Sequence, residues 1–500
     1  MYIRKNKGIT LIALIITVIV MLILAGVAIG SIINNGLIDK TGQAVEAYNN
    51  SVNNENDQIN NALGWFDNIN NGGSNDNGGS TDGSWNGTVN TPKLASGMKA
   101  VYWAKDDSGD IDTENPANNT IEITQDDPNF KPENWYNYVA QTGTTDGQTS
   151  RWANAITDDG SYWVWIPRFA YEITKGLGTN TAGTINIKFL QGTTNKDSDG
   201  NTISTTYPTV TGDAMTDYVV EPCFTNGTAN NYANGEWKAE IAGIWVAKFR
   251  ASHSDATSLV IGTSTTIKIV PSIQSWTNAT PGDSYTFSRE YNENLESHLM
   301  KNSEWGAVAY LTHSQYGRNG TAVTANNRIM TGGNDYKSNT NQSSTGNITG
   351  IYDLSSSNGW ENVASYITDG VASLSTYGWP GILTTANENP TGVSTPYATA
   401  YPYNSSSDTG TANYAATNNY KAYKNLKDSS NGTYGYGDAI LETSSSANAT
   451  SSWFSNYSNF PNSAGPFFTR GSIYNSGGVF GFNYATSGYI YGGFRIVLVP

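Results

Sequence analysis

Residues that commonly carry out chemistry are few in this chain. The sequence has one cysteine, Cys223, and three histidines that are far apart, His253, His298 and His313. One thiol cannot form an internal disulfide, and no CxxC pair is present for zinc or redox chemistry. A lone cysteine is more often a small buried apolar residue than a nucleophile. We therefore expect neither a metal site nor a cofactor.

The acidic residues do not form a recognisable catalytic pattern either. The pairs Asp106-Asp107 and Asp126-Asp127 lie in loop-like sequence. They are typical of solvated charges, or at most of oxygen ligands for calcium. No spacing indicates a Ser-His-Asp set or the two carboxylates of a glycosidase. The sequence therefore favours a protein that binds or assembles, and we expect it not to be an enzyme.

Composition and charge narrow the function classes further. The chain has 500 residues, of which only 14% are charged, and its net charge is -15. An acidic surface repels phosphates, so nucleic acid is not expected as a partner. Abundant Gly, Asn, Ser, Thr and Tyr are typical of a loop-rich extracellular domain whose aromatic side chains make contacts.

The amino terminus carries the sharpest local signal. Arg4, Lys5 and Lys7 precede an apolar run of 25 residues, 9–33, and no charge follows until Asp39. At ~1.5 Å per residue this run spans the ~30 Å apolar core of a bilayer with some tilt. The basic flank should remain inside. The sequence therefore predicts a single-pass membrane protein whose carboxyl-terminal domain is extracellular.

The same region resembles the leader of type IV prepilins, in the letters KGITLIAL at 7–14. The resemblance implies a prepilin peptidase as partner, with Lys7 and Gly8 as recognition residues and Ile9 as the first mature residue. Ala13 stands where major pilins usually have a glutamate, which argues against assembly into a long fibre. A plain membrane anchor is the alternative. A cleaved secretory signal fits poorly, because the run is long and no A-x-A site follows.

Four regions follow from these patterns. Residues 1–8 are the expected leader, and 9–65 are expected to form the membrane helix and an amphipathic stem. Residues 66–91 are rich in Gly, Ser, Asn and Asp and predict a flexible linker. From 92 to 500, short runs of aromatic and β-branched residues, such as YWVWIPRFAYEI at 162–173 and GIWVAKFR at 243–250, predict strands.

A helix is also expected near residue 302, capped by Asn302 or Ser303, with Trp305, Val308 and Ala309 on one apolar face. Strands, one clear helix and long polar loops together predict an α+β exterior domain.

Five segments of this domain resemble, in order, the formylglycine-generating-enzyme (sulfatase-modifying) superfamily, a branch of the C-type lectin fold. They are 243–249, 298–310, 350–364, 469–472 and 493–497. The matching residues are Leu299, Glu304, Trp305, Gly350, Tyr352, Asp353, Trp360, Glu361, Arg470, Gly471, Gly493, Phe494 and Arg495. The chain departs from the family at Met300, Lys301 and Asn302. It is also one residue longer between Asp353 and Trp360.

The resemblance implies a loop-rich C-type-lectin-like domain, and we interpret its matching residues as scaffold. Trp305, Trp360 and Phe494 are expected in the core. The charged residues Glu304, Glu361, Arg470 and Arg495, buried or at the rim, are expected to hydrogen-bond each other and hold loops. Formylglycine generation in that family uses a pair of cysteines that bind copper. Since this chain has Cys223 alone, such an enzyme is only an alternative interpretation.

The last stretch, 470–495, resembles the variable end of proteins diversified by retroelements, which share this fold. Scaffold glycines and aromatics alternate there with Tyr, Ser and Asn, residue types typical of adaptable contact surfaces. We expect a variable, ligand-binding end at about 466–500. The expected contact residues are Ser472, Ile473, Tyr474, Asn475, Ser476, Asn483, Tyr484, Thr486, Tyr489, Ile490 and Tyr491.

Two functional classes stay open on these patterns. The first is an adhesin-like or receptor-like protein whose ligand is a protein or a glycan. The second is a minor structural pilin or pseudopilin with a decorative head domain, which would have other pilins as partners.

Overall fold

The computed structural model describes residues 91–140, 150–226, 237–253, 267–277, 279–333, 335–357, 359–367, 396–401, 436–447, 450–462, 465–471, 478–485 and 492–500. The chain divides into two units, Met1–Asp76 and Asn77–Pro500, and all described residues belong to the second. The expected leader with Lys7, Gly8 and Ile9, the membrane helix and the stem lie outside them. Among the described helices, none combines the length and apolarity needed to cross a bilayer.

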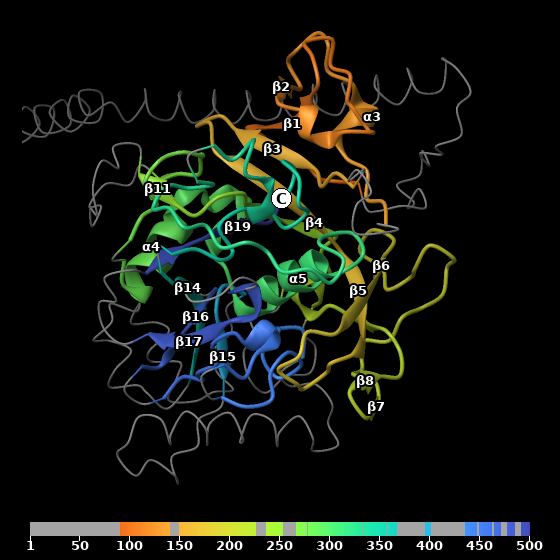
Figure 1. Ribbon diagram of the computed structural model, residues 1–500, viewed down its shortest axis with the longest axis vertical. Coiled ribbons are helices and arrows are strands. Elements are labelled where there is room, and N and C mark those ends of the chain that lie inside the picture. The colour runs from red at the N-terminus through yellow and green to blue at the C-terminus, as the bar shows by residue number, and fades with distance from the viewer. Residues whose placement is uncertain are drawn as a thin grey trace, which may run out of the picture. The chain divides into compact units, whose positions relative to one another are not determined.

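A seven-stranded antiparallel sheet forms the centre of the described unit (Figure 1). Its strand order is β13-β19-β10-β4-β3-β1-β2. The strands are β1 Met98–Ala104, β2 Ile121–Thr124, β3 Asn154–Thr157, β4 Tyr162–Pro167, β10 Gly243–Ala247, β13 His298–Leu299 and β19 Ile496–Leu498. The latest strand in sequence, β19, therefore lies inside the sheet, between β10 and β13.

A five-stranded sheet carries the carboxyl-terminal motifs. Its order is β15-β14-β16-β17, and β18 also pairs with β14. The strands are β14 Glu361–Ile367, β15 Thr399–Tyr401, β16 Phe467–Arg470, β17 Phe482–Ala485 and β18 Gly493–Phe494.

Smaller elements complete the strands. A third sheet contains β5 Phe169–Lys175, β6 Thr184–Phe189 and β9 Val219–Val220, and two hairpins are β7 Val210–Thr211 with β8 Ala214–Met215, and β11 Ser252–His253 with β12 Ile267–Lys268.

The apolar runs that the sequence indicated are strands, but two of them are divided. The run 162–173 is split between β4 and β5, which belong to different sheets. Pro167 ends β4, since proline offers no N–H to continue a ladder. The buried guanidinium of Arg168 then donates to Phe224 O at 2.7 Å. The β-branched run 493–498, which also predicts a strand, is likewise divided at Arg495 between β18 and β19.

Helices are few in the described residues. They include the single turn α3 Pro132–Trp135, α4 Pro281–Tyr291 and α5 Asn302–His313. The helix expected near residue 302 is α5, and 11 of its 12 residues are buried, Ser303 being the exception. The mixture of many strands with few helices confirms the α+β class.

The expected cap of α5 is wrong. Neither Asn302 nor Ser303 precedes the helix, because Asn302 is its first residue and Lys301 holds the N-cap position. The Glu304 carboxylate accepts the Lys301 backbone N–H at 2.8 Å, which satisfies a donor that helix bonds leave free.

Candidate functional site

The described strands bring together one end of each tyrosine-rich segment. β14 lies between β16 and β18, so that Glu361 faces Arg470 on one side and Gly493 on the other. The segment 472–477 begins just after Arg470, and the segment 486–491 ends just before Gly492. Neighbouring strands lie about 4.8 Å apart. The two attachment points are therefore about 10 Å apart.

The other end of the second segment lies elsewhere. In the β16–β17 hairpin, Arg470 pairs with Phe482 and Phe467 pairs with Ala485. Ala485, which precedes the segment 486–491, therefore lies at the end of the hairpin away from Arg470, whereas Gly493, which follows it, lies at the Arg470 end.

Two of the eleven expected contact residues fall within the described part of the chain. Tyr484 is half-buried in β17, and its ring lies over Gly465, where an added Cβ would come within 2.4 Å of it. Asn483 is only 9% exposed, which is less than an exposed contact residue requires. The nine others lie outside the described residues: Ser472, Ile473, Tyr474, Asn475, Ser476, Thr486, Tyr489, Ile490 and Tyr491.

A buried ionic cluster lies directly beneath the attachment points. Glu361 accepts Arg250 Nε at 3.1 Å and Arg495 Nε and Nη2 at 3.1 and 3.0 Å. All three side chains are at most 1% exposed. Arg495 also donates to Ala247 O at 2.6 Å and to Tyr352 O at 2.8 Å. The cluster therefore joins the central sheet to β14 and to the strand that follows the second segment.

Two glycines let the backbone approach this cluster. Gly471 has φ +81°, and a Cβ there would lie 2.9 Å from Leu354 O. A Cβ on Gly493 would lie 3.2 Å from Trp276 O. In either case the added Cβ would also lie within 3.9 Å of the Arg250 guanidinium. A side chain at either glycine would push the segment ends away from the charges that hold them.

The first turn of α5 contains a second buried ionic group. Glu304 accepts His298 Nε2 at 2.8 Å, and Lys301 Nζ lies 3.1 Å from the same oxygen. Burial opposes ionisation of Glu304, but the charges of His298 and Lys301 outweigh it and lower the pKa of Glu304 to about 2. Lys301, which departs from the family pattern, is thus part of the scaffold in this chain.

The remaining scaffold residues are also inside. Trp305, Tyr352, Asp353, Trp360 and Phe494 are each at most 2% exposed. The Asp353 carboxylate accepts the Gly332 N–H at 2.9 Å and Asn326 Nδ2 at 2.7 Å, and thereby closes a loop.

Arg470 holds a different part of the chain. It donates to the carbonyls of Asp438 and Ala439 at 2.9 and 3.1 Å, and its guanidinium lies 5.8 Å from the Trp305 ring. The start of the first tyrosine-rich segment is therefore fixed to the 436–447 region.

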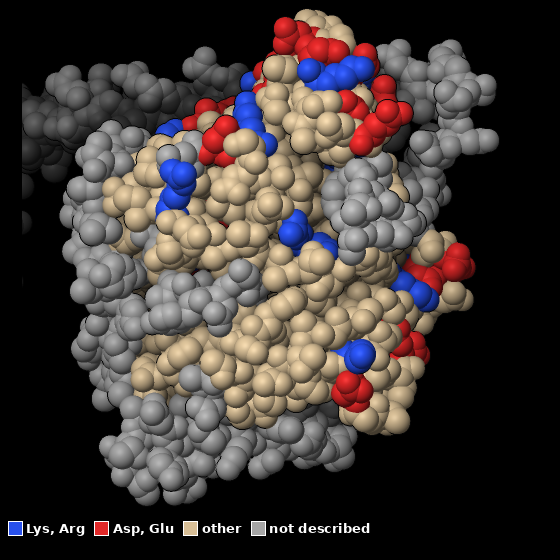
Figure 2. All heavy atoms as spheres, viewed as in Figure 1, with Lys and Arg blue, Asp and Glu red and all other residues tan. Residues whose placement is uncertain are grey.

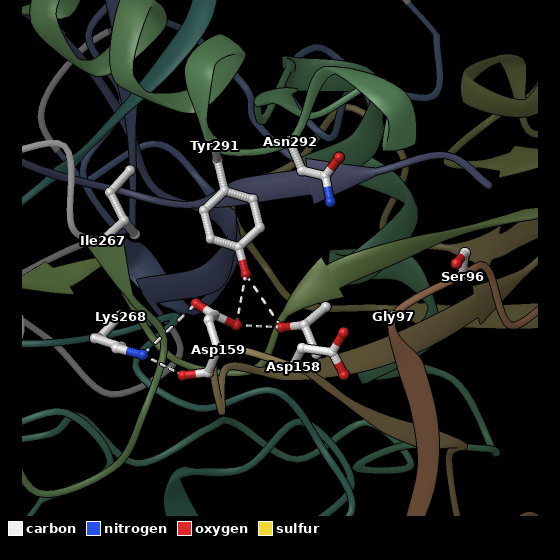
Figure 3. A pocket seen from close by; sticks show the side chains of 9 residues that line it. Ser96, Gly97, Asp158, Asp159, Ile267, Lys268, Tyr291 and Asn292 are labelled. Carbon is white, nitrogen blue, oxygen red and sulfur yellow. Dashed lines mark hydrogen bonds and ion pairs between the residues drawn. The ribbon is translucent and has the colours of Figure 1, made fainter. Parts of the chain in front are cut away.

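A polar cavity of about 480 Å³ opens at another place, beside the end of α4 (Figure 3). The Asp159 carboxylate accepts Thr157 Oγ1 at 2.6 Å, Ser161 Oγ at 2.8 Å and Tyr291 Oη at 3.1 Å. Lys268 lies 4.0 Å from the same carboxylate. Most of these bonds close the turn between β3 and β4, so we interpret them as fixing the turn. No sequence pattern indicated this cavity.

The residues considered for chemistry are not placed for it. Cys223 is 3% exposed, and burial, followed by the charge of Glu221, raises the pKa of its thiol well above the usual value, which keeps it protonated. Burial lowers the pKa of His313, whose Nε2 faces the Gly183 carbonyl at 2.9 Å. Across the described ranges no three His, Cys, Asp or Glu side chains gather as a metal would require.

A buried carboxyl group offers a sharp pH test. Glu221 is fully buried, and its Oε2 has no hydrogen-bond partner among the described residues. Burial, followed by the charge of Glu442, raises its pKa well above the usual value. Glu442 itself accepts the hydroxyls of Tyr171 and Tyr207 at 2.8 and 3.0 Å, and also that of Tyr310. The Gly437 N–H donates to the same carboxylate at 2.9 Å.

We expect Glu221→Gln to become increasingly stable, relative to the unsubstituted protein, as pH rises above about 4.3, the usual glutamate pKa. A raised folded-state pKa contributes stability below that value, and this contribution is lost as pH rises toward the folded-state pKa. The difference in unfolding free energy should grow by about 1.4 kcal/mol per pH unit in this window. Urea unfolding at pH 4.5, 6 and 7.5 measures it. A pH-independent difference would contradict a raised pKa for Glu221. Glu172→Gln is the control, because Glu172 is half-buried in β5.

No family model matches the chain, and no curated protein matches it. The resemblances described above therefore depend on the motif residues themselves, and the geometry of the described residues carries the functional argument.

Proposed function

We propose that this is a surface-displayed binding protein, anchored through its pilin-like amino-terminal helix, with an exterior domain of the C-type-lectin-like type. The carboxyl-terminal tyrosine-rich segments are its contact surface. The observation that supports this most is the position of the Arg250–Glu361–Arg495 cluster under the two attachment points. A buried, doubly paired carboxylate holds the scaffold in place while the segments between the anchors can change in sequence.

The surrounding surface supports an uncharged ligand. Figure 2 shows that Lys, Arg, Asp and Glu gather around β1, β2 and α3. The described surface over α5 and over the five-stranded sheet below it carries few charges. Tyr, Ser and Asn in the two segments supply flat apolar area and hydrogen-bonding groups. A neutral glycan or a polar protein surface matches these groups better than a polyanion does.

Diversification of the carboxyl-terminal end is part of this proposal. Asparagine codons are the ones rewritten in retroelement-diversified proteins, and Asn475 lies at an expected contact position. Sequencing the gene and its neighbourhood tests it directly. A reverse transcriptase beside a near-identical copy of the coding stretch for 466–500 supports diversification, and an invariant stretch with no such copy contradicts it.

We expect Tyr474→Ala, Tyr489→Ala or Tyr491→Ala to weaken binding by more than ~1–2 kcal/mol, because aromatic anchors dominate contact energies. The melting temperature should change little. Binding is measured with the full chain in detergent on an array of neutral glycans and immobilised surface proteins. Tyr218→Ala is the matched control, since Tyr218 is half-buried before β9 and contacts Lys188. Loss of melting temperature in the first three variants, with unchanged binding, would contradict the contact role.

A further inference from the structure

Lys248 is a buried amine whose contacts include no carboxylate. It follows β10, and its side chain is fully buried. Nζ donates to Asn154 Oδ1 at 2.7 Å, to Gly350 O at 3.1 Å and to Ile348 O. It also lies 4.5 Å from the centre of the Trp103 ring. Among the described residues no acid lies within ion-pairing distance of Nζ. A buried ammonium ion in such a site is costly unless a carboxylate balances it.

The side chain of Asn154 is held in one orientation against this amine. Asn154 begins β3 and is 1% exposed. Its Nδ2 donates to Trp152 O and to Thr349 O, each at 2.8 Å. Because both neighbours of Nδ2 are acceptors, the carbonyl oxygen must be the atom that faces Lys248. The amide therefore presents its C=O group to the amine.

We propose that Lys248 and Asn154 join in an intramolecular amide cross-link. The Lys248 nitrogen forms a bond to Asn154 Cγ, and the Cγ–Nδ2 bond breaks. One proton passes from the amine to Nδ2, which leaves as ammonia. The product is a secondary amide, and the reaction consumes no other reagent.

The geometry suits the first step. A C=O bond is about 1.2 Å long, so Nζ lies within about 4 Å of Asn154 Cγ, close to the separation of reacting atoms. Burial lowers the pKa of Lys248 well below its usual value, which increases the neutral, nucleophilic form of the amine. The site is lined by the rings of Trp103 and Tyr352, which limit access for water.

The cross-link would join strands that are far apart in the sequence. Asn154 and Val246 both pair with Val164, on opposite sides of β4. A bond between Asn154 and Lys248 would therefore connect β3 to β10 across β4. A covalent closure over such a long loop restricts the unfolded chain, as a disulfide does. This would supply a covalent tie to an exterior domain whose sequence offers one cysteine.

Mass spectrometry of the purified full chain tests the proposal. We expect a mass that is one ammonia molecule lower than the mass calculated from the sequence for the amino terminus found in the same sample. We also expect a tryptic product that joins 152–168 to 239–250, since an acylated Lys248 resists trypsin. Lys248→Arg and Asn154→Ala should each restore the full mass.

The control is Lys188→Arg, because Lys188 is half-exposed and pairs with Asp197 at 3.2 Å, so its replacement should keep the reduced mass. A full-mass chain that trypsin cleaves after Lys248 would overturn the proposal and assign the site to a buried ammonium ion. The wild-type mass decides this even if a variant fails to fold. It is also independent of ligand binding, so it stands apart from the proposed function.

Discussion

Replacing Glu361 with alanine is expected to lower the free energy of unfolding by about 3–5 kcal/mol, because a buried ion pair would lose one partner. In this protein one carboxylate serves two guanidinium groups. Arg250 and Arg495 would both remain buried, with their donors to Glu361 unsatisfied. Glu361→Gln keeps the shape of the side chain and one acceptor, so its free energy of unfolding should lie between those of the unsubstituted protein and Glu361→Ala. Urea unfolding followed by tryptophan fluorescence measures all three proteins.

An exposed ion pair provides the control for this substitution. Lys99 and Asp126 lie 2.6 Å apart, but their side chains are 46% and 66% exposed. Solvent screens such a pair, so Asp126→Ala should have little effect on stability. If Glu361→Ala were as mild as Asp126→Ala, the cluster would not hold the two sheets together, and the scaffold proposed for the contact surface would fail.

Trp305→Ala is expected to cost about 3–5 kcal/mol, as is usual when a large aromatic side chain is removed from a core. The ring lies on α5 and is fully buried. Its Nε1 donates to Val479 O at 2.7 Å, so truncation would also leave a buried carbonyl without that donor. Trp305→Phe should cost less, since part of the volume remains. Differential scanning calorimetry of the two variants measures the difference.

Phe287 is the matched control on the other long helix. It is half-buried on α4, where its ring lies 5.1 Å from that of Trp276. Phe287→Ala removes less buried area and should be clearly milder than Trp305→Ala. Equal costs would mean that Trp305 is not a central packing residue, and that the tie between α5 and the 478–480 turn is weak.

The sequence indicated the ionic residues better than their partners. Glu361 and Arg495 were expected to hydrogen-bond because charges in an apolar setting must be compensated. Arg250 was part of a strand-like run, and nothing in the sequence connected it to a glutamate 111 positions away. The pairing of Arg250 with Glu361 arises from strand order, which one sequence does not reveal. Glu304 was expected to pair with the scaffold arginines, but it contacts His298 and Lys301, which lie six and three positions before it.

Some secondary-structure elements could be predicted from the sequence, and others could not. α5 was predictable because its apolar face is regular, whereas α4 was missed. Its start has the capping pattern of Thr280, Pro281 and Asp283, which could have revealed it. The division of 162–173 between two sheets depends on tertiary packing around Arg168, although Pro167 is a sequence signal for the end of a strand. The polar cavity beside Tyr291 unites four separate segments, so no local pattern could predict it.

The place of β19 has a consequence for synthesis and quality control. β19 lies between β10 and β13, yet it is translated after both tyrosine-rich segments. The central sheet cannot close until those segments have been made in frame. A nonsense codon or frameshift introduced among them would remove an internal strand and leave two strands with open edges. Defective copies should therefore be degraded before display, so that cells present intact versions of the contact surface.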